Sequence, residues 1–305
     1  MENKSIYTVT IGIPAYNEEA NITNLLNSIL RQKEDGYLIE RIIVLSDAST
    51  DKTVEKVEEI KDPRIEILDF KKRMGKSYHL NTFPKIVNSD ILALFDADVV
   101  LNGEDVIKKL IEPIIKEENV GLVSGNFLPI RVKNFFQHAV KTTINVYEVL
   151  RQEWKGGHNA FGCTGRIQAL SKPFYKVLKV PPTMVLNDIY TYFDCIQNGF
   201  EFRHVKSVNV YYQLPTNLKD YLNQFKRFCV GSSRMSKIFQ DLYTQEYSIS
   251  KKRFYLLMLK QFTNKPIHCI FICFVNIIGK FMATRELKKM DGKWEVVTST
   301  KNLNN

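Results

Sequence analysis

The sequence predicts an α/β fold, with a mostly parallel central sheet, helices on both faces and a basic helical tail. Apolar β-branched runs alternate with amphipathic stretches through about the first 130 residues. Parallel strands joined by crossover helices give this alternation. A chain of 305 residues has room for one such domain and an appendage. The net charge of +10 belongs to the tail, because residues 219–305 hold 16 Lys/Arg against 6 Asp/Glu.

The first half of the chain is expected to contain five strands and the helices between them. Each strand is a short run rich in Val, Ile and Leu, and each helix repeats its apolar residues at helical spacing. The expected strands are residues 8–14, 41–47, 64–70, 91–95 and 120–127, and the expected helices are residues 18–29, 50–60, 76–87 and 103–116.

Beyond about residue 130 the pattern is less regular. We expect strands at 160–170 and 201–213, helices at 134–154 and 187–198, and only helices from residue 218 onward. The most apolar run, residues 267–282, is shorter than the roughly 20 residues that span a bilayer, and Asn276 and Lys280 interrupt it. A helix lying on a membrane surface is therefore favoured over a span.

The overall composition is that of a globular protein, with 44% hydrophobic and 25% charged residues. The five cysteines lack paired zinc-type spacing, so reduced thiols are expected. The first residues show no apolar signal core, which favours a cytoplasmic location. The positive charge of the tail fits either nucleic acid or an anionic membrane face.

Two acids, Asp96 and Asp98, follow the buried strand expected at 91–95. A buried carboxylate is costly unless it is paired, so the acids belong at the carboxyl end of the strand, where open α/β sheets bind ligands. Residues two apart on an extended chain point the same way, so both acids could contact one cation. A polar turn after a strand is the simpler alternative.

Polar segments also follow the other early strands, as PAYNEE (14–19), SDAST (46–50) and MGKSYHLN (74–81). Asp47 is suited to bond a base or ribose, Pro14 and Tyr16 to form a wall for a base, and Lys76 to meet a phosphate or base. No glycine-rich phosphate loop follows any strand, which argues against P-loop and dinucleotide-binding proteins. Each segment alone is an ordinary loop, but their recurrence at successive strand ends indicates a binding site.

The order PAYNEE, SDAST, GKSYHLN and FDAD resembles the family-2 inverting glycosyltransferases, which include cellulose, chitin and hyaluronan synthases and have the A-type glycosyltransferase fold. GCTGRIQAL (162–170) is similar to the acceptor-side glycine segment, VLND (185–188) to the segment with the catalytic acid, and QFKRF (224–228) to the Gln-x-x-Arg-Trp signature. The segment DGKWEVVTSTK (291–301) also resembles the synthases. In two departures, Asn187 replaces the usual glutamate and Phe228 the usual tryptophan.

The resemblance implies a metal-dependent, inverting transfer of a hexosyl or N-acetylhexosaminyl group from a nucleotide diphosphate sugar, usually a UDP-sugar. Asp98 would coordinate Mn²⁺ or Mg²⁺, and Asp188 would take the proton from the acceptor hydroxyl. The donor would be held by Pro14, Tyr16, Glu18, Asp47, Lys76, Asp96 and Arg227, and the acceptor by Gly165, Gln224 and Phe228. The catalytic domain would cover residues 1–235, with a nucleotide-sugar half (1–130) and an acceptor half (131–235), and residues 236–305 would form a membrane-associated tail.

Simpler explanations exist for several of these residues. Asp188 can act as a helix N-cap. The QFKRF segment can be a basic amphipathic helix with Phe225 and Phe228 in the core. A lone histidine is more often structural, so neither His79 nor His158 is assigned to a metal.

Several functions also remain open. The acceptor can be a growing glycan, a lipid-linked sugar or a lipid phosphate of the dolichol or undecaprenyl type. The absence of a clear transmembrane bundle argues against a chain-exporting synthase, so a peripheral enzyme on the inner face of the cell membrane is expected. A nucleic-acid-binding protein would leave the strand-end motifs unexplained, so nucleic acid is not the favoured partner. A catalytically dead sugar-binding protein is disfavoured by intact Asp47, Asp96, Asp98 and Asp188.

Overall fold

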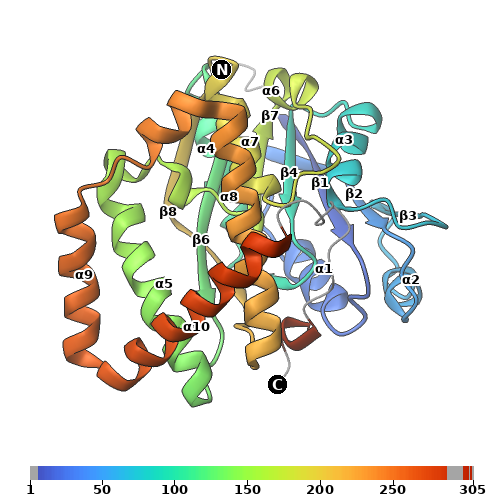
Figure 1. Ribbon diagram of the computed structural model, residues 1–305. Coiled ribbons are helices and arrows are strands. Elements are labelled where there is room, and N and C mark those ends of the chain that lie inside the picture. The colour runs from blue at the N-terminus through green and yellow to red at the C-terminus, as the bar shows by residue number, and fades with distance from the viewer. Residues whose placement is uncertain (1–5, 287–297, 302, 304–305) are drawn as a thin grey trace.

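A computed structural model describes residues 6–286, 298–301 and 303 of the protein and confirms the α/β fold (Figure 1). Its central sheet has eight strands in the order β3-β2-β1-β4-β7-β6-β8-β5. The strands are β1 (Tyr7–Ala15), β2 (Tyr37–Ser46), β3 (Ile65–Asp69), β4 (Ile91–Phe95), β5 (Val99–Leu101), β6 (Val120–Pro129), β7 (Ile167–Ser171) and β8 (Glu201–Tyr212).

The sheet is parallel on its N-terminal side and mixed on the other. Strands β3, β2, β1 and β4 are parallel neighbours, and β6 is parallel to β8. Strand β7 runs antiparallel to both β4 and β6, and β5 runs antiparallel to β8. The carboxyl ends of β1, β2 and β4 therefore meet at one edge, where Asp47 N donates to Ala15 O over 2.8 Å.

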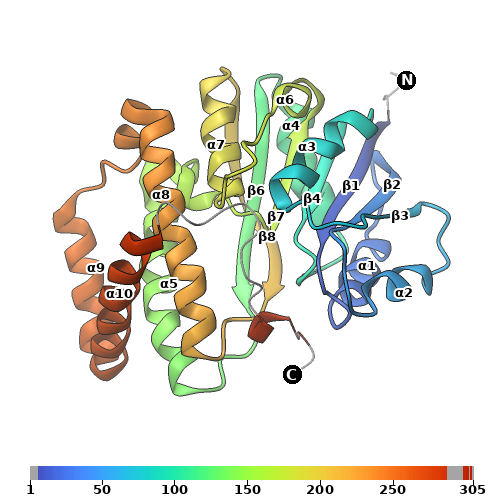
Figure 2. The same ribbon diagram turned by 45° about the vertical axis from the view of Figure 1, so that its right-hand side comes forward.

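Helices cover both faces of this sheet, as Figure 2 shows. The helices of the sheet region are α1 (Ile22–Leu30), α2 (Thr53–Glu58), α3 (Lys76–Ile86), α4 (Val106–Lys116), α5 (Phe135–Glu153), α6 (Lys172–Val177) and α7 (Asn187–Gln197). Helices α1 and α4 pack on one face, whereas α3, α6 and α7 pack on the other. Strand β4 contributes to the hydrophobic core on both faces of the sheet. Ala93 and Phe95 belong to the core that contains α1 and α4, whereas Leu92 and Leu94 belong to the core that contains α3, α6 and α7. Such burial on both faces accounts for its uninterrupted apolar sequence.

Two local expectations were wrong or incomplete. Residues 160–165 do not extend β7, because Asn159 accepts a hydrogen bond from Phe161 N at 3.0 Å and turns Ala160–Gly162 into a 3-10 helix. The short strand β5 and helix α6 were not anticipated. Both are only a few residues long, and they depend on pairing or packing with distant segments rather than on a local pattern.

The C-terminal region consists of α8 (Leu218–Glu246), α9 (Lys251–Asn264) and α10 (Pro266–Glu286). The domain boundary expected at residue 235 falls inside α8. Helix α10 packs back on the sheet domain: Tyr221 Oη donates to Asn276 Oδ1 over 2.7 Å, and a Cβ on Gly279 would lie 2.6 Å from Phe225.

The length of α10 corrects the expectation that its apolar run is too short for a span. Its segment Pro266–Arg285 is long and apolar enough to cross a bilayer, by length and composition alone.

Candidate functional site

A cavity of about 260 Å³ opens at the edge of the sheet where β1, β2 and β4 end. It collects nearly all the residues that the sequence singled out, from both halves of the catalytic region. Those residues are Pro14, Tyr16, Glu18, Asp47, Lys76, Asp96, Asp98, Gly165, Asp188, Gln224 and Arg227. Phe228 does not line it and is 42% exposed.

Asp96 and Asp98 lie on a short turn between β4 and β5. The turn is held by Asp96 N, which donates to Arg166 O over 3.3 Å, and by the pairing of β5 with β8. Asp96 forms an ion pair with Lys76. Asp98, in contrast, has no hydrogen bond or ion pair with any described residue, and burial, followed by the charge of Asp96, raises the pKa of its carboxyl. The two acids are thus chemically distinct: one is paired and the other is available.

The carboxylates in the cavity fit a divalent cation that is bound partly by the protein and partly by the substrate. Among the described residues, no group of three or more His, Cys, Asp or Glu side chains is placed to hold a metal alone. Mg²⁺ and similar hard cations are commonly held by one or two carboxylates together with substrate phosphates. Asp98, a partly buried carboxylate without a partner beside a second acid, matches that arrangement.

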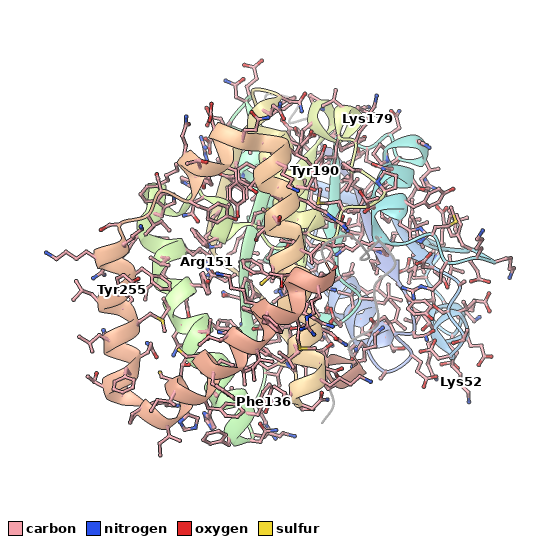
Figure 3. All side chains as sticks on the ribbon, in the orientation of Figure 1. Lys52, Phe136, Arg151, Lys179, Tyr190 and Tyr255 are labelled. Atoms are coloured by element: carbon pink, nitrogen blue, oxygen red, sulfur yellow. The ribbon has the colours of Figure 1, made fainter. Side chains whose placement is uncertain are left out.

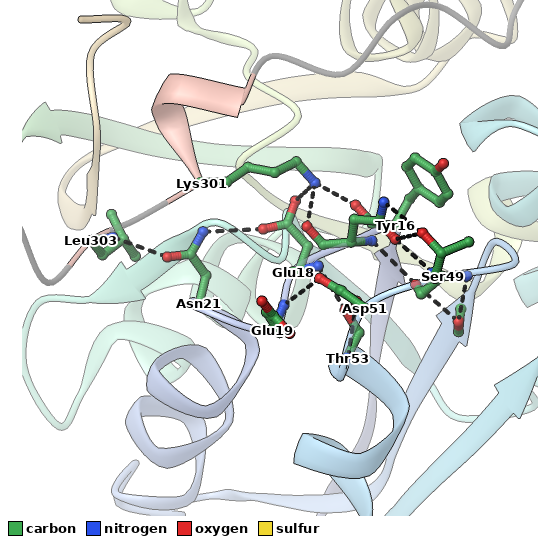
Figure 4. A network of polar contacts seen from close by, with 12 residues as sticks. Tyr16, Glu18, Glu19, Asn21, Ser49, Asp51, Thr53, Lys301 and Leu303 are labelled. Carbon is green, nitrogen blue, oxygen red and sulfur yellow. Dashed lines mark hydrogen bonds and ion pairs between the residues drawn. The ribbon is translucent and has the colours of Figure 1, made fainter.

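Glu18 faces the same space from the loop after β1. It is only 8% exposed, and its backbone N donates to Thr53 Oγ1 over 2.7 Å. One carboxylate oxygen accepts from Asn21 Nδ2 at 3.1 Å, and the other lies 2.6 Å from Lys301 Nζ (Figure 4). Burial and the nearby charge of Asp98 raise the pKa of Glu18 to about 7, although Lys301 opposes the shift.

Lys301 belongs to a C-terminal segment that docks against the cavity. Its ammonium also bonds to the carbonyl oxygens of Tyr16 and Asn17, the latter at 2.8 Å. The same segment is held where Ser299 N donates to Asp220 Oδ2 over 2.8 Å. Leu303 N also donates to Asn21 Oδ1, over 3.0 Å (Figure 4). The expected motif 291–301 is only partly visible, because residues 291–297 lie outside the described residues.

Asp47 forms the second wall of the cavity and organises the loop before α3. Its carboxylate accepts from Met74 N (2.6 Å), Gly75 N (3.0 Å) and His79 Nε2 (2.8 Å). Burial by itself raises the pKa of Asp47, but these hydrogen bonds outweigh it and the net pKa is lowered. The Arg73 guanidinium stacks 4.0 Å above the Tyr16 ring. His79 therefore supports Asp47, in keeping with a structural histidine.

Asp188 reaches the cavity from the first turn of α7. Its carboxylate accepts from Gly165 N at 3.1 Å and from Ile189 N at 2.9 Å. The N-cap of α7 is Leu186. Asp188 is therefore not the helix N-cap, which was the simpler explanation for this residue. Gly165 leaves little room here, since a Cβ on it would lie 3.2 Å from Lys76 Nζ and 3.4 Å from Asp188 Cβ.

Comparison with known proteins identifies the family of the chain. The profile of glycosyl transferase family 2 matches residues 10–178, which is more than half of the chain. The chain belongs to glycosyl transferase family 2. It is therefore an enzyme that transfers sugars. The family resemblance, the fold and the enzyme class expected from the sequence are confirmed.

The glycosyltransferase is 25% identical over 261 residues to poly-β-1,6-N-acetyl-D-glucosamine synthase of Staphylococcus aureus, covering 83% of this chain and 60% of that protein. It is 30% identical over 127 residues to 4,4'-diaponeurosporenoate glycosyltransferase of Staphylococcus haemolyticus, covering 40% of this chain and 32% of that one. The chain thus spans about 60% of the length of the synthases that it matches.

Solved structures share the fold. A mannosyltransferase from Pyrobaculum calidifontis, in complex with GDP-Man and Mn²⁺, superposes with a TM-score of 0.60 at 18% identity, covering 93% of this chain and 82% of that one. Glucosyl-3-phosphoglycerate synthase from Mycobacterium tuberculosis, with UDP and Mn²⁺, gives a TM-score of 0.52 at 17% identity, covering 76% and 80%.

Helix α8 contributes the last wall of the glycosyltransferase cavity. Gln224 and Arg227 line it, whereas Phe225 packs on α10. Burial lowers the pKa of Arg227, and the carboxylates of Asp188 and Asp96 oppose that shift. The QFKRF segment therefore places some side chains in the cavity and others in helix packing, and an acceptor contact by Phe228 stays a prediction.

Three basic residues of the cavity were missed by the sequence reasoning. Arg166 lies inside the glycine segment, Arg73 precedes the GKSYHLN motif, and Lys301 ends the C-terminal motif. Each stands in or beside a segment already noted, but lysine and arginine are common on surfaces, so nothing in the sequence distinguished these three. His158, also considered, accepts from His204 N at 3.1 Å and does not line the cavity.

Proposed function

We propose that the protein is a metal-dependent, inverting transferase that moves a hexosyl or N-acetylhexosaminyl group from a nucleotide diphosphate sugar to an acceptor hydroxyl. One observation carries the proposal: an unpartnered carboxylate, Asp98, and a second carboxylate, Asp188, line one cavity at the carboxyl edge of the sheet. A single-displacement transfer needs both a charge-neutralising group at the leaving diphosphate and a base at the attacking hydroxyl.

The donor half of the cavity would bind the nucleotide. Pro14, Tyr16 and Asp47 would enclose the base, Glu18 would border its binding site, and Lys76 and Asp96 would bond the ribose or diphosphate. Asp98 would hold Mn²⁺ or Mg²⁺, which when bound neutralises charge on the diphosphate. UDP is our first choice of nucleotide because of the resemblance to the synthases, and the mannosyltransferase complex with GDP-Man makes GDP the second.

Asp188 would act as the general base. Its two hydrogen bonds, from Gly165 N and Ile189 N, orient the carboxylate. Arg227, which lines the cavity from α8, would bind the leaving diphosphate with its fork of donors. Gly165, Gln224 and Phe228 would border the acceptor.

The outer helices support a membrane location. On α10, exposed apolar side chains include Ile270 (61%), Phe274 (63%) and Ile277 (69%). On α9, Tyr255 is exposed (67%) (Figure 3). Exposed basic residues flank them at Lys251, Lys252, Lys260, Lys265, Lys280 and Arg285. Apolar surface beside positive charge suits an anionic bilayer interface, whereas nucleic acid would use only the charge.

The position of α10 suggests a lipid-linked acceptor. One side of α10 packs on α8 and α5, so a bilayer would meet its opposite side and the helix would lie on the membrane rather than span it. Helix α8 in turn lines the cavity through Gln224 and Arg227. We therefore place the enzyme on the inner face of the cell membrane, with a lipid-linked sugar or surface glycan as acceptor. Transfer to a lipid phosphate is the second candidate, since the same location serves it.

A donor panel tests the proposal. Purified full-length protein is incubated with UDP- and GDP-sugars, with and without Mn²⁺, and release of the nucleotide diphosphate is followed. We expect release from one nucleotide class, dependent on the metal, and a product of inverted anomeric configuration by NMR. Equal release in excess chelator, or a retained configuration, contradicts the proposal.

A further inference from the structure

Arg151 on α5 is a buried positive charge without a counter-ion (Figure 3). The residue is 4% exposed, its Nε is buried without a hydrogen-bond partner, and no ion pair or side-chain hydrogen bond joins its guanidinium to any described residue. Glu148 attracts it only from a distance, and burial lowers the pKa of Arg151. An isolated buried charge destabilises the folded protein by several kcal/mol, so such a charge is usually compensated by a partner or retained for a function.

A second arginine shares an aromatic ring with Arg151. The Arg151 and Arg166 guanidinium carbons each lie 4.9 Å from the centre of the Phe127 ring, and Arg166 also lies 4.1 Å from the centre of Tyr212. Arg166 lines the cavity and has no ion pair with a carboxylate of the described residues. The two arginines therefore share one aromatic ring, with Arg166 at the cavity wall and Arg151 inside the protein.

The charges that line the cavity already balance without Arg151. Five basic and five acidic side chains, apart from His79, line it among the described residues. The two charges of a bound divalent cation offset those of a nucleotide-sugar diphosphate. Arg151 does not line the cavity and adds one positive charge to this balanced set, with Glu148 near enough to attract it but not to form an ion pair.

We propose that the acceptor carries an anionic oxygen group, a phosphate or a carboxylate, which Arg166 binds at the cavity wall and Arg151 stabilises from behind Phe127. The inference rests on the proposed function and narrows its acceptor class. Arginine suits such a group, since its planar fork of donors matches an oxyanion and its face stacks on aromatic rings. Arg151 acts through Phe127 and Arg166, and is thus a positioning residue.

A matched acceptor series tests the charge. Octyl β-glucoside, its 6-phosphate and octyl β-glucuronide differ only at carbon 6. With saturating donor and Mn²⁺, we expect KM for one or both anionic acceptors to be about 10- to 100-fold below that of the neutral one, the size of a charge-assisted hydrogen bond. Preference for the phosphate or for the glucuronide identifies the source of the anion. Equal KM values for all three overturn the inference, while the continued turnover leaves the proposed function intact.

Substitutions then separate binding from packing. Arg151→Met and Arg166→Met should each raise KM for the anionic acceptor at least about tenfold, and Arg151→Lys should restore part of the loss. Arg31→Met removes the same charge from an exposed site at the end of α1, outside the cavity, and should change nothing. Because Arg151 is an unpaired buried charge, Arg151→Met should leave Tm unchanged or higher. A lower Tm with unchanged acceptor KM would assign Arg151 to packing alone.

Anion binding can also be measured without turnover. With the nucleotide diphosphate and Mn²⁺ occupying the donor half, inorganic phosphate should raise Tm of the wild type more than that of Arg151→Met or Arg166→Met. The same increase in all three proteins overturns the inference. A phosphate effect that depends on the arginines, without any sugar transfer, would instead contradict the proposed function and keep the anion site.

Discussion

Lys301 and Glu18 are separated by 283 residues in the sequence, yet Lys301 Nζ lies 2.6 Å from Glu18 Oε1. This contact closes one end of the cavity with the C-terminal segment. It also offsets part of the charge on two neighbouring acids, because Lys301 opposes the burial that raises the pKa of both Glu18 and Asp98. The electrostatics of the donor half therefore depend on a residue far outside the segment that the family profile matches.

The raised pKa of Glu18 makes stability depend on pH in a predictable direction. In the unfolded chain the carboxyl titrates near 4.5, whereas in the metal-free folded protein it titrates near 7. The folded state holds a proton that the unfolded state releases between these values, so this stabilisation is complete below pH 4.5 and is lost as pH rises through 7. In urea denaturation from pH 5 to 8, the wild type should lose up to about 3 kcal/mol of unfolding free energy through this group, and Glu18→Gln should not show that loss. Glu19→Gln, at an exposed neighbour, should follow the wild type, and parallel curves for all three would refute the burial effect.

Replacing Lys301 should extend the same titration. Lys301→Met removes the positive charge that lowers the Glu18 pKa, so the loss of stability should begin at the same pH as in the wild type, near 4.5, but continue to a higher pH. Lys280→Met removes an equal charge from the exposed face of α10 and serves as the control. An unchanged midpoint in Lys301→Met would mean that the ion pair does not persist in solution.

Asp98 should be required for transfer. Asp98→Asn keeps the shape but loses the negative charge that would hold a cation, so transfer should fall below detection, and chelation should do the same to the wild type. Asp241→Asn, on the exposed side of α8, should retain wild-type activity. Full turnover of Asp98→Asn with saturating Mn²⁺ would remove Asp98 from the site of the metal.

Asp188 should be required for turnover more than for donor binding. Asp188→Asn can keep one of the two hydrogen bonds from Gly165 N and Ile189 N but cannot accept a proton. Turnover should fall by about two to four orders of magnitude with little change in donor affinity by calorimetry. Asp194→Asn, on the same helix but outside the cavity, is the matched control. Near-normal turnover would leave Asp188 with only a structural role.

The exposed face of α10 should determine membrane binding. The triple change Ile270→Ser, Phe274→Ser and Ile277→Ser removes apolar area without touching the side packed on α8. It should lower sedimentation with anionic liposomes at least about tenfold. High salt should weaken wild-type binding only in part, because apolar burial is not screened. The control changes three exposed residues elsewhere, Leu38, Leu68 and Val177, to serine. Equal losses in both triple variants would show that α10 has no special role.

Much of the site was readable from the sequence because it depends on short-range patterns. Apolar runs such as residues 91–95 identified strands, and acids directly after them had to lie at a shared sheet edge, since parallel strands end together. That reasoning located Asp47, Asp96 and Asp98, and the motif order located Asp188 and Arg227. The 160–170 strand was misplaced because a single side chain, Asn159, turns the backbone there.

The sequence by itself determined the alternation of strands and helices, the acids at the strand ends and the charge of the tail, all of which follow from local spacing and composition. Only the tertiary structure decided which acid is paired. Lys76 forms an ion pair with Asp96 and Lys301 forms one with Glu18, whereas Asp98 has no ion-pair partner among the described residues. It also decided that Arg151 is buried without a counter-ion. Pairing and burial depend on which distant segments the fold brings within a few ångströms, and no local pattern encodes that distance.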